Sequence, residues 1–569
     1  LMLKIWNTLT REKEDFNPIK DGKVSIYTCG PTVYSRAHIG NMRTYIFMDT
    51  LRKVLKYNGY ELNHVMNITD VGHLTSDADE GEDKMEKSAK EKNMSVYEIA
   101  KIYTDAFFKD IGKLNIETPE HVVKATEHIK QMEEYVIEIM NNGYAYETSK
   151  GIYFDTSKLK SYGELSRIDL NKQRAGARIE VDPEKRNPLD FALWIKAPKE
   201  HIMKWDSKFG KCYPGWHIEC SAMSREYLGD VFDIHTGGVD HIPVHHENEI
   251  AQAKGATGKN PAHYWMHVEF LLIDNGKMSK SLKNVYLIDD LEKKGIEPLA
   301  YRYLCFTSHY RNKLNFTWDS VESAQKSLIR LRKLTKTHEF GDNKIDEEKV
   351  KKYELDFIEA INDDLNMPLA VSIAWEVAKQ EEKSKQLFEL LMKFDKVLSL
   401  NLNEELESEI NEKLKSNNVV VRILGNEDKN KGSIIILKDK KINRCFEIEI
   451  ISCCQINIIE NSKKIETGLF IEDLENWIYN LYNPIEYLYE FVGGKLNNRI
   501  LTREEINEIS NELTKDYSEE RKKGIAVHRK ELDDQPTVEG YLGPMYNGID
   551  YGKIILRYET QEVYDMLSD

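Results

Sequence analysis

The sequence predicts an α/β protein built around a parallel sheet, followed by a helical bundle and a separate α+β module. Three patterns carry this prediction. Short apolar and β-branched runs near residues 24, 62 and 231 alternate with helical patterns. Helical periodicity then continues for about eighty residues beyond Trp318. After Leu400 the sequence changes again, to short apolar runs separated by turn residues.

The first predicted unit is a strand, a loop and a helix. Residues 24–29 are apolar or β-branched and stop at Gly30-Pro31, and His38-Ile39-Gly40 leads into the periodic stretch 44–55. A second short strand is expected at residues 62–69. This order indicates a βαβ unit on a parallel, Rossmann-like sheet, where nucleotides bind at the carboxyl ends of the strands.

The second half of this sheet domain is expected further along the chain. It comprises a strand at residues 231–235, a helix from about Val244 and a strand at 268–273. Between the halves lie a charge-dense stretch, a helical pattern and the strand-like residues 151–155. We therefore predict an insertion that splits the sheet domain.

The resulting organisation has five segments. The expected ranges are 1–114 for the first half of the sheet domain, 115–200 for the connective insertion, 201–325 for the second half, 326–405 for the helical bundle and 406–569 for an α+β module of unknown function. Within the module we expect strands at 419–424, 433–437 and 446–451, and helices near 471–482 and 503–513.

Composition limits the class of protein. Seven cysteines in 569 residues argue against a disulfide framework and for a reducing compartment. The start of the chain lacks the apolar core of a signal peptide, and no later run is long enough to cross a bilayer, so a cytoplasmic protein is expected. The formal charge of −16 counts against general nucleic-acid binding, although a local basic face could still serve.

Two short motifs suit the handling of a nucleotide triphosphate. In His38-Ile39-Gly40-Asn41, Gly40 allows a phosphate to approach the backbone, while the imidazole and the amide can donate hydrogen bonds to phosphoryl oxygens. Lys277-Met278-Ser279-Lys280-Ser281 follows a turn, and its two ammonium groups could neutralise a leaving pyrophosphate. Each motif alone also fits a surface loop. Their order, at opposite ends of a split nucleotide fold, favours the functional interpretation.

The chain here resembles class I aminoacyl-tRNA synthetases, in which these two motifs are the signatures. Further segments are similar to the cysteinyl-tRNA synthetase family, densely up to about residue 335 and more weakly to about 400: residues 27–34, 67–70, 125–129, 190–194, 214–223, 245–249 and 362–368. The resemblance implies a parallel-sheet catalytic domain and a helical bundle that binds tRNA.

A metal site can be argued from residue types. His245 and Glu249 stand four residues apart, so they share one face of a helix, and thiolates from Cys29 and Cys220 would complete a four-ligand zinc site. Each residue also has an ordinary structural interpretation, as a buried thiol, an interior imidazole or a solvated carboxylate. The remaining alternative ligands are His235, His241 and Cys212.

The family resemblance favours Cys29, Cys220, His245 and Glu249 and gives the ion a role. A borderline-soft cation with thiolate ligands prefers the sulfur of cysteine to the hydroxyl of serine, so it can discriminate between the two without proofreading. A zinc hydrolase is the weaker metal hypothesis, because His246-Glu247 lacks the second histidine of a His-Glu-x-x-His helix.

The implied reaction has two steps: L-cysteine and ATP with Mg²⁺ give cysteinyl-adenylate, and the cysteinyl group then passes to the 3′ end of tRNA-Cys. One Zn²⁺ per chain and a monomer are expected. The assigned residues are His38, Asn41, Lys277 and Lys280 for catalysis, Gly40, Gly238, Asp240 and Lys280 for ATP, and Thr69 and Trp216 for the amino acid.

Two departures from the family leave alternatives open. Asn41 stands where the first motif usually ends in a second histidine, and unfamiliar sequence from about residue 403 replaces the usual small anticodon-reading segment. One alternative is a tRNA-independent cysteine ligase that acylates a small amine. The other is a degenerate, synthetase-like regulatory protein, against which the retained ligands and Lys277 argue.

Overall fold

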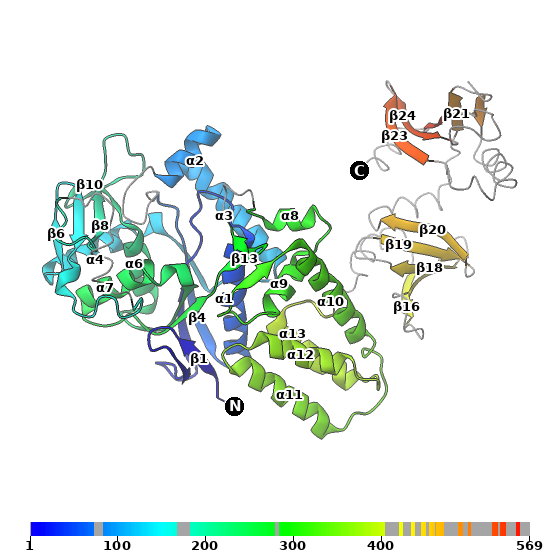
Figure 1. Ribbon diagram of the computed structural model, residues 1–569, viewed down its shortest axis with the longest axis horizontal. Helices are drawn as coiled ribbons and strands as arrows, with labels where there is room; N and C mark the ends of the chain where they lie inside the picture. Colours follow the sequence, from blue (N-terminus) through cyan, green and yellow to red (C-terminus); the bar gives the residue numbers. More distant parts are fainter. Residues whose placement is uncertain are drawn as a thin grey trace. The chain divides into compact units, whose positions relative to one another are not determined.

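The structure is a computed structural model that describes residues 2–72, 83–167, 183–278 and 284–403, together with the backbone of strands between residues 420 and 557. The chain divides into two compact units, Leu1–Asn403 and Glu404–Asp569. The first unit contains the sheet domain, the connective domain and the helical domain (Figure 1).

A five-stranded parallel sheet forms the centre of the first unit. Its order is β12-β11-β3-β4-β5, and Ile26 of the middle strand lies between His64 of β4 and Ile234 of β11. The strands predicted near residues 24, 62 and 231 are confirmed. The bounds are β3 (Lys23–Thr28), β4 (Glu61–Ile68), β5 (His121–Lys124), β11 (Phe232–Gly238) and β12 (Ala262–Val268).

Helix α1 (Ile39–Tyr57) connects β3 to β4 and is buried along most of its length. Residues 45–55 are all buried, so the charged groups among them need internal partners. Asp49 accepts hydrogen bonds from Lys53 at 2.7 Å and from Arg302 at 2.6 Å, and Arg52 donates to Glu120 at 2.8 Å. The helix begins earlier than the predicted 44–55 because His38 caps its first turn.

Two features differ from the predicted sheet. Strand β5 lies within the range expected for the insertion, yet it pairs parallel with β4 and extends the central sheet. The strand predicted at 268–273 is divided into β12 and β13 (Leu271–Ile273), and β13 belongs to another sheet with β14 (Gly276–Lys277) and β15 (Leu314–Phe316). The division is explained by buried Arg43, whose side chain donates hydrogen bonds to the carbonyl groups of Glu269 at 2.7 Å and Phe270 at 2.8 Å.

The connective domain has its own antiparallel sheet, of order β6-β7-β8-β10-β9. In Figure 1 this sheet lies with helices α4, α6 and α7 on the far side of the central sheet from the helical domain. The bounds are β6 (Ala145–Glu147), β7 (Gly151–Phe154), β8 (Phe191–Lys196), β9 (Trp205–Ser207), β10 (Gly210–Pro214), α4 (Ile129–Asn141), α6 (Trp216–Leu228) and α7 (His245–Thr257).

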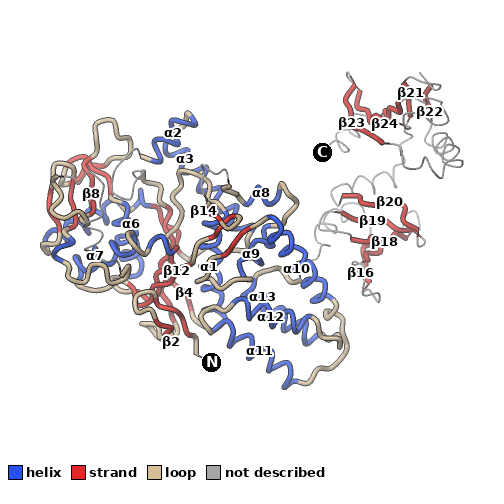
Figure 2. Tube along the Cα trace, in the orientation of Figure 1, coloured by secondary structure: helices blue, strands red, loops and turns tan. Residues whose placement is uncertain are grey.

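The remaining elements of the first unit are a hairpin and helices. The hairpin is β1 (Lys4–Asn7) with β2 (Glu12–Asp15), and the helices are α2 (Lys84–Lys92), α3 (Val96–Lys113), α8 (Ile288–Glu292), α9 (Pro298–Phe306), α10 (Trp318–Lys336), α11 (Glu347–Asn362), α12 (Met367–Ala378) and α13 (Lys385–Leu398). Helices α10 to α13 gather into the predicted helical domain (Figure 2).

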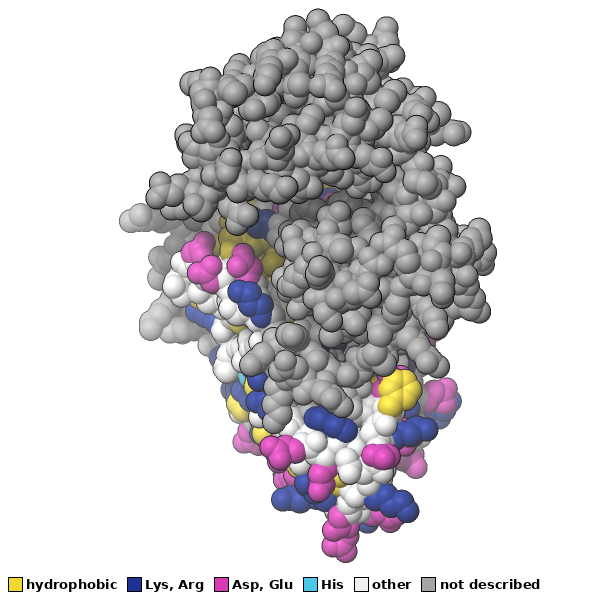
Figure 3. Space-filling model, turned by 90° about the vertical axis from the view of Figure 1, so that its right-hand side faces the viewer, with side chains coloured by type: hydrophobic (Ala, Val, Ile, Leu, Met, Phe, Trp, Pro, Cys, Tyr) yellow, Lys and Arg dark blue, Asp and Glu magenta, His cyan; other side chains and the backbone are white. Residues whose placement is uncertain are grey.

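The basic residues of α10 do not form one continuous charged face. Arg332 is buried, where it pairs with Glu297 at 2.9 Å and donates to the carbonyl of Leu400 at 2.8 Å. Lys326 and Arg330 are exposed. On the described surface that faces the viewer in Figure 3, Lys and Arg side chains are interspersed with Asp and Glu.

The second unit contains two five-stranded sheets, in the orders β16-β17-β18-β19-β20 and β22-β21-β25-β24-β23. The three strands predicted between residues 419 and 451 are confirmed as an antiparallel set, while the helices predicted near 471–482 and 503–513 lie outside the described residues. The bounds are β16 (Val420–Leu424), β17 (Ile434–Lys438), β18 (Cys445–Ile450), β19 (Gln455–Glu460), β20 (Lys463–Phe470), β21 (Leu488–Val492), β22 (Arg499–Leu501), β23 (Ala526–Leu532), β24 (Gln535–Tyr541) and β25 (Lys553–Arg557).

Candidate functional site

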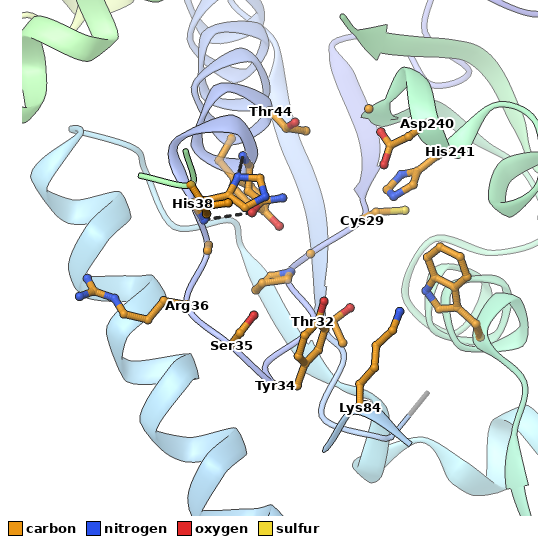
Figure 4. A pocket seen from close by; sticks show the side chains of 18 of the residues that line it. Cys29, Thr32, Tyr34, Ser35, Arg36, His38, Thr44, Lys84, Asp240 and His241 are labelled. Atoms are coloured by element: carbon orange, nitrogen blue, oxygen red, sulfur yellow. Dashed lines mark hydrogen bonds between the residues drawn. The ribbon is translucent and has the colours of Figure 1, made fainter. Parts of the chain in front are cut away.

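A cavity of about 690 Å³ opens at the carboxyl ends of β3 and β11. Figure 4 shows Cys29, Asp240 and His241 on one side of it and His38 on the other. The connective domain also contributes to its walls, through Tyr213 and Trp216. Among the residues that line the cavity are Cys29, Thr32, Tyr34, Arg36, His38, Asn41, Lys84, Tyr213, Trp216, Gly238, Asp240, His241 and Met278.

Four of the lining or adjacent side chains converge beneath one wall. Cys29 follows β3, Cys220 lies on α6, and His245 and Glu249 lie one turn apart on α7. The two sulfur atoms are 4.0 Å apart, and Nε2 of His245 is 3.0 Å from Oε1 of Glu249. One ligand atom from each of the four residues lies within 4.8 Å of the others.

Burial makes the charges of this cluster interdependent. All four residues are at most 6% exposed, so each charge depends on its neighbours for compensation. The hydrogen bond from Cys29 lowers the pKa of the Cys220 thiol to about 6, and His245 acts in the same direction. Burial lowers the pKa of His245, but Glu249 and Cys220 outweigh it and raise the value to about 10.

Glu249 is held in place by a second histidine. Nε2 of His235, on β11, lies 2.8 Å from Oε2 of Glu249, which fixes the carboxylate in one orientation. Burial opposes ionisation, yet His235 and His245 hold the pKa of Glu249 well below its usual range. The other carboxylate oxygen, Oε1, lies 3.0 Å from Nε2 of His245 and faces the cluster.

These observations test whether the donor set fits a metal ion. Two thiols, one imidazole and one carboxylate converge in a buried pocket. That combination suits a tetrahedral Zn²⁺ site. A second set that includes Cys29 and Glu249 is formed with His235 and His246, so those two histidines are alternative ligands.

The other two alternative ligands are placed differently. Cys212 lies on β10, where its sulfur contacts the carbonyl of Phe209 at 3.7 Å, and it belongs to neither of these two sets. His241 lines the cavity, with its ring 5.1 Å from that of His245. His241 therefore lies next to the cluster, toward the substrate cavity.

The first motif forms the start of α1. His38 is the N-cap residue: its Nδ1 accepts from the backbone N–H of Asn41 at 3.2 Å, and Oδ1 of Asn41 accepts from the N–H of His38 at 3.0 Å. Asn41 therefore uses its oxygen in the cap, and its amide nitrogen is left to donate. A Cβ at Gly40 would lie 3.1 Å from the His38 ring, so a larger residue here would require that ring to shift by a few tenths of an ångström.

Of the residues assigned to ATP and to the amino acid, Gly238, Asp240 and Trp216 line the cavity. Trp216 also stacks on His245, with ring centres 4.4 Å apart, so it joins the cavity to the cluster. Thr69 lies outside the described lining, and it donates to Glu219 at 3.3 Å from a buried position.

The second motif is described only in part. The side chain of Lys277 is exposed on β14, and Met278 lines the cavity, whereas Lys280 lies outside the described residues. Lys84 and Tyr34 reach the cavity without having been predicted. Lys84 lies in a charge-dense stretch, where a single lysine gives no signal of a role in the cavity. Asp83 is nevertheless a recognisable N-cap residue at the start of this helix.

A family model described as the tRNA synthetases class I (C) catalytic domain matches residues 15–326. The methionyl-tRNA synthetase of Mycobacterium tuberculosis, solved in complex with methionyl-adenylate, aligns with a TM-score of 0.47 at 14% identity, over 66% of this chain and 90% of that one. The matched sequence, the parallel sheet and the two motifs define a class I aminoacyl-tRNA synthetase.

The particular family follows from curated relatives. A cysteine--tRNA ligase of Treponema denticola is 47% identical over 429 residues, which cover 71% of this chain and 87% of that protein. A cysteine--tRNA ligase of Borreliella burgdorferi is 43% identical over 463 residues, covering 78% and 93%. The chain belongs to the cysteine--tRNA ligase family. Within its described part, every helix is too short or too polar to span a bilayer.

Proposed function

We propose that this protein activates L-cysteine with ATP and transfers the cysteinyl group to the 3′ end of tRNA-Cys. The observation that carries the proposal is the juxtaposition of a buried Cys29, Cys220, His245 and Glu249 cluster with a cavity of about 690 Å³ that the first motif also lines. The cluster can recognise a thiol, and the cavity provides space for an adenylate beside it.

The cluster would hold Zn²⁺ and select the substrate by its sulfur. A bound zinc ion supplies a borderline-soft acceptor that binds a thiolate more strongly than an alcohol. His235 would keep Glu249 oriented for this role, through the 2.8 Å contact between them. Trp216 would form the wall that packs against the amino acid, because it lines the cavity and stacks on His245.

The opposite wall would bind the nucleotide. His38 and the amide nitrogen of Asn41 stand at the N-terminus of α1, where backbone N–H groups and the helix dipole favour phosphate. Asp240 would bind a ribose hydroxyl, and Lys277 and Lys280 would stabilise the departing pyrophosphate with Mg²⁺. Positioning and charge neutralisation suffice, since this phosphoryl-centred exchange needs no covalent enzyme intermediate.

Cysteine-dependent exchange of pyrophosphate into ATP tests the activation step. We expect exchange with cysteine and little with serine, and we expect Cys220→Ser to lose zinc and to raise the KM for cysteine. Cys212→Ser is the matched control, because Cys212 is a buried thiol outside the cluster. Absence of exchange in a folded, zinc-loaded protein would refute the proposal.

Aminoacylation of a tRNA-Cys transcript tests the transfer step. The helical domain α10 to α13, which follows the sheet domain, supports a tRNA substrate over a small amine. Charging of the transcript is therefore expected. Exchange without charging would instead favour the tRNA-independent ligase.

A further inference from the structure

A second group of metal-binding side chains lies apart from the Cys29 cluster. Asp83 precedes helix α2, Glu86 lies in its first turn, and His201 lies in the segment between β8 and β9 of the connective domain. One ligand atom from each lies within 4.8 Å of the others. Nε2 of His201 is 3.7 Å from Oδ2 of Asp83, and its Nδ1 is 3.3 Å from Oε1 of Glu86.

Two atoms of this group are buried without a hydrogen-bond partner. Asp83 caps α2 with Oδ1, which accepts from the N–H groups of Met85 at 2.8 Å and Glu86 at 3.0 Å. Its other oxygen, Oδ2, and Nε2 of His201 have no partner among the described residues. Asp83 is 5% exposed and His201 is 7% exposed, so water cannot easily replace the missing partner.

The spacing of these two atoms suits a shared cation. A separation of 3.7 Å is too long for a hydrogen bond. Two ligands that are each about 2.1 Å from a zinc ion stand about 3.4 Å apart in a tetrahedron.

We propose that Asp83, Glu86 and His201 form a second binding site for a divalent transition-metal cation of the Zn²⁺ class. Two carboxylates and one imidazole supply oxygen and nitrogen ligands without a thiolate, which suits Zn²⁺ or Mn²⁺. Three protein ligands leave one position for a water molecule. The site is independent of the proposed cysteine activation, because it shares no residue with the thiol cluster.

The second cation would join two walls of the substrate cavity. Lys84, the residue after Asp83, lines the cavity, and so does Tyr213, whose ring stacks on that of His201 with centres 4.2 Å apart. Glu86 adds a direct link between the two domains, since it accepts a hydrogen bond from the N–H of Ile202 at 2.7 Å. The ion would thereby fix the connective domain against the start of α2.

Metal analysis of the purified full chain tests the site. After loading with Zn²⁺ and removal of free metal, the unaltered protein is expected to hold two equivalents per chain. Asp83→Asn and His201→Ala should each hold one. His263→Ala, which changes an exposed histidine, is the matched control and should retain two.

Cobalt substitution separates this site from the thiol cluster. With Co²⁺, Asp83→Asn should keep the thiolate-to-cobalt charge-transfer absorption while losing one equivalent. Cys220→Ser should weaken that absorption and still bind a cobalt ion at the Asp83 site. Loss of metal binding at the thiol cluster would therefore be distinguished from loss of metal binding at the Asp83 site.

Some outcomes would overturn the inference. If the unaltered chain binds a single equivalent and His201→Ala and Asp83→Asn both leave it unchanged, the cluster is an internal set of polar contacts that binds no metal. Should either variant fail to fold, as judged by circular dichroism, titration of the metal-stripped unaltered chain with Co²⁺ decides: one equivalent must bind without adding to the thiolate-to-cobalt absorption, and absence of that equivalent rejects the site.

Discussion

Replacement of Gly30 by alanine should disable the site without touching a proposed ligand. Gly30 follows Cys29, and its N–H donates to Oδ1 of Asn67 at 2.8 Å. The same oxygen lies 3.9 Å from the sulfur of Cys220. The loop that carries Cys29 is therefore packed directly on Asn67, near the end of β4, and Asn67 in turn contacts Cys220.

The size of the effect follows from the available space. A Cβ at Gly30 would lie 1.6 Å from the backbone oxygen of Asn67, and such contacts are essentially never shorter than 3.0 Å. The loop or the strand must therefore move by about 1.4 Å, and a displacement of about 1 Å at a site costs on the order of 100-fold in rate. Metal ligands tolerate only about 0.2 Å, so zinc binding should weaken as well.

The assay compares two glycine-to-alanine variants. Gly30→Ala should lower cysteine-dependent pyrophosphate exchange by about 100-fold or more and reduce zinc content. Stability should fall by about 1–3 kcal/mol. Gly112→Ala is the control: Gly112 lies in α3 with no atom within 4 Å of an added Cβ, so it should keep full activity and gain up to about 1 kcal/mol. Equal activity and zinc content in the two variants would refute the reasoning.

Three further predictions concern stability and domain independence. Arg302→Met should cost about 3–5 kcal/mol in chemical denaturation, because it removes one of the two cations that pair with buried Asp49 and leaves the buried carbonyl groups of Leu398 and Leu114 without their donor; a loss below about 1 kcal/mol would contradict this. Burial disfavours the charged form of Glu120, but Arg52 outweighs burial and lowers the pKa of Glu120 from 4.5 to about 2. The Glu120 carboxylate therefore stabilises the fold fully above pH 4.5, and this stabilisation is lost as the pH falls toward 2. Glu120→Gln should therefore remove part of the stability lost between those pH values, and an unchanged acid-unfolding profile would disprove it. The fragment 1–403 forms one compact unit and should retain pyrophosphate exchange, whereas an inactive, folded fragment would show that the second unit is required.

Local patterns were sufficient where a segment's neighbours do not matter. The apolar runs near residues 24 and 62 became β3 and β4, and the helix expected from about Val244 became α7 (His245–Thr257). These three elements follow from the short-range pattern of apolar residues. The one-turn spacing of His245 and Glu249 likewise brings these two ligands onto the same helix face.

Long-range packing explains what was missed. Strand β5 is only four residues long, and its pairing with β4 depends on the sheet rather than on its own sequence. The break between β12 and β13 depends on Arg43, which is more than two hundred residues away along the chain. His201 and Asp83 also approach only through packing of the connective domain against α2.

The order of the central sheet explains why the proposed zinc ligands are so widely scattered in sequence. From β3 the chain proceeds through α1 to β4 and β5 on one side, whereas β11 and β12 lie on the other. The order in which the chain adds strands therefore reverses between β3 and β11. At such a switch point a crevice forms outside the carboxyl ends of the two strands. Cys29 leaves β3 there, with its N–H directed to the carbonyl of Thr236 on β11 at 3.4 Å.

The insertion lies on the connection that must cross this crevice. The chain passes from β5 through the connective domain and α6 before it enters β11, so α6 is delivered to the same edge and brings Cys220 with it. Helix α7, which follows β11, then supplies His245 and Glu249. Neither half of the sheet domain contains the complete proposed donor set, so the proposed thiol-binding site would form only when both halves and the crossing connection have folded together.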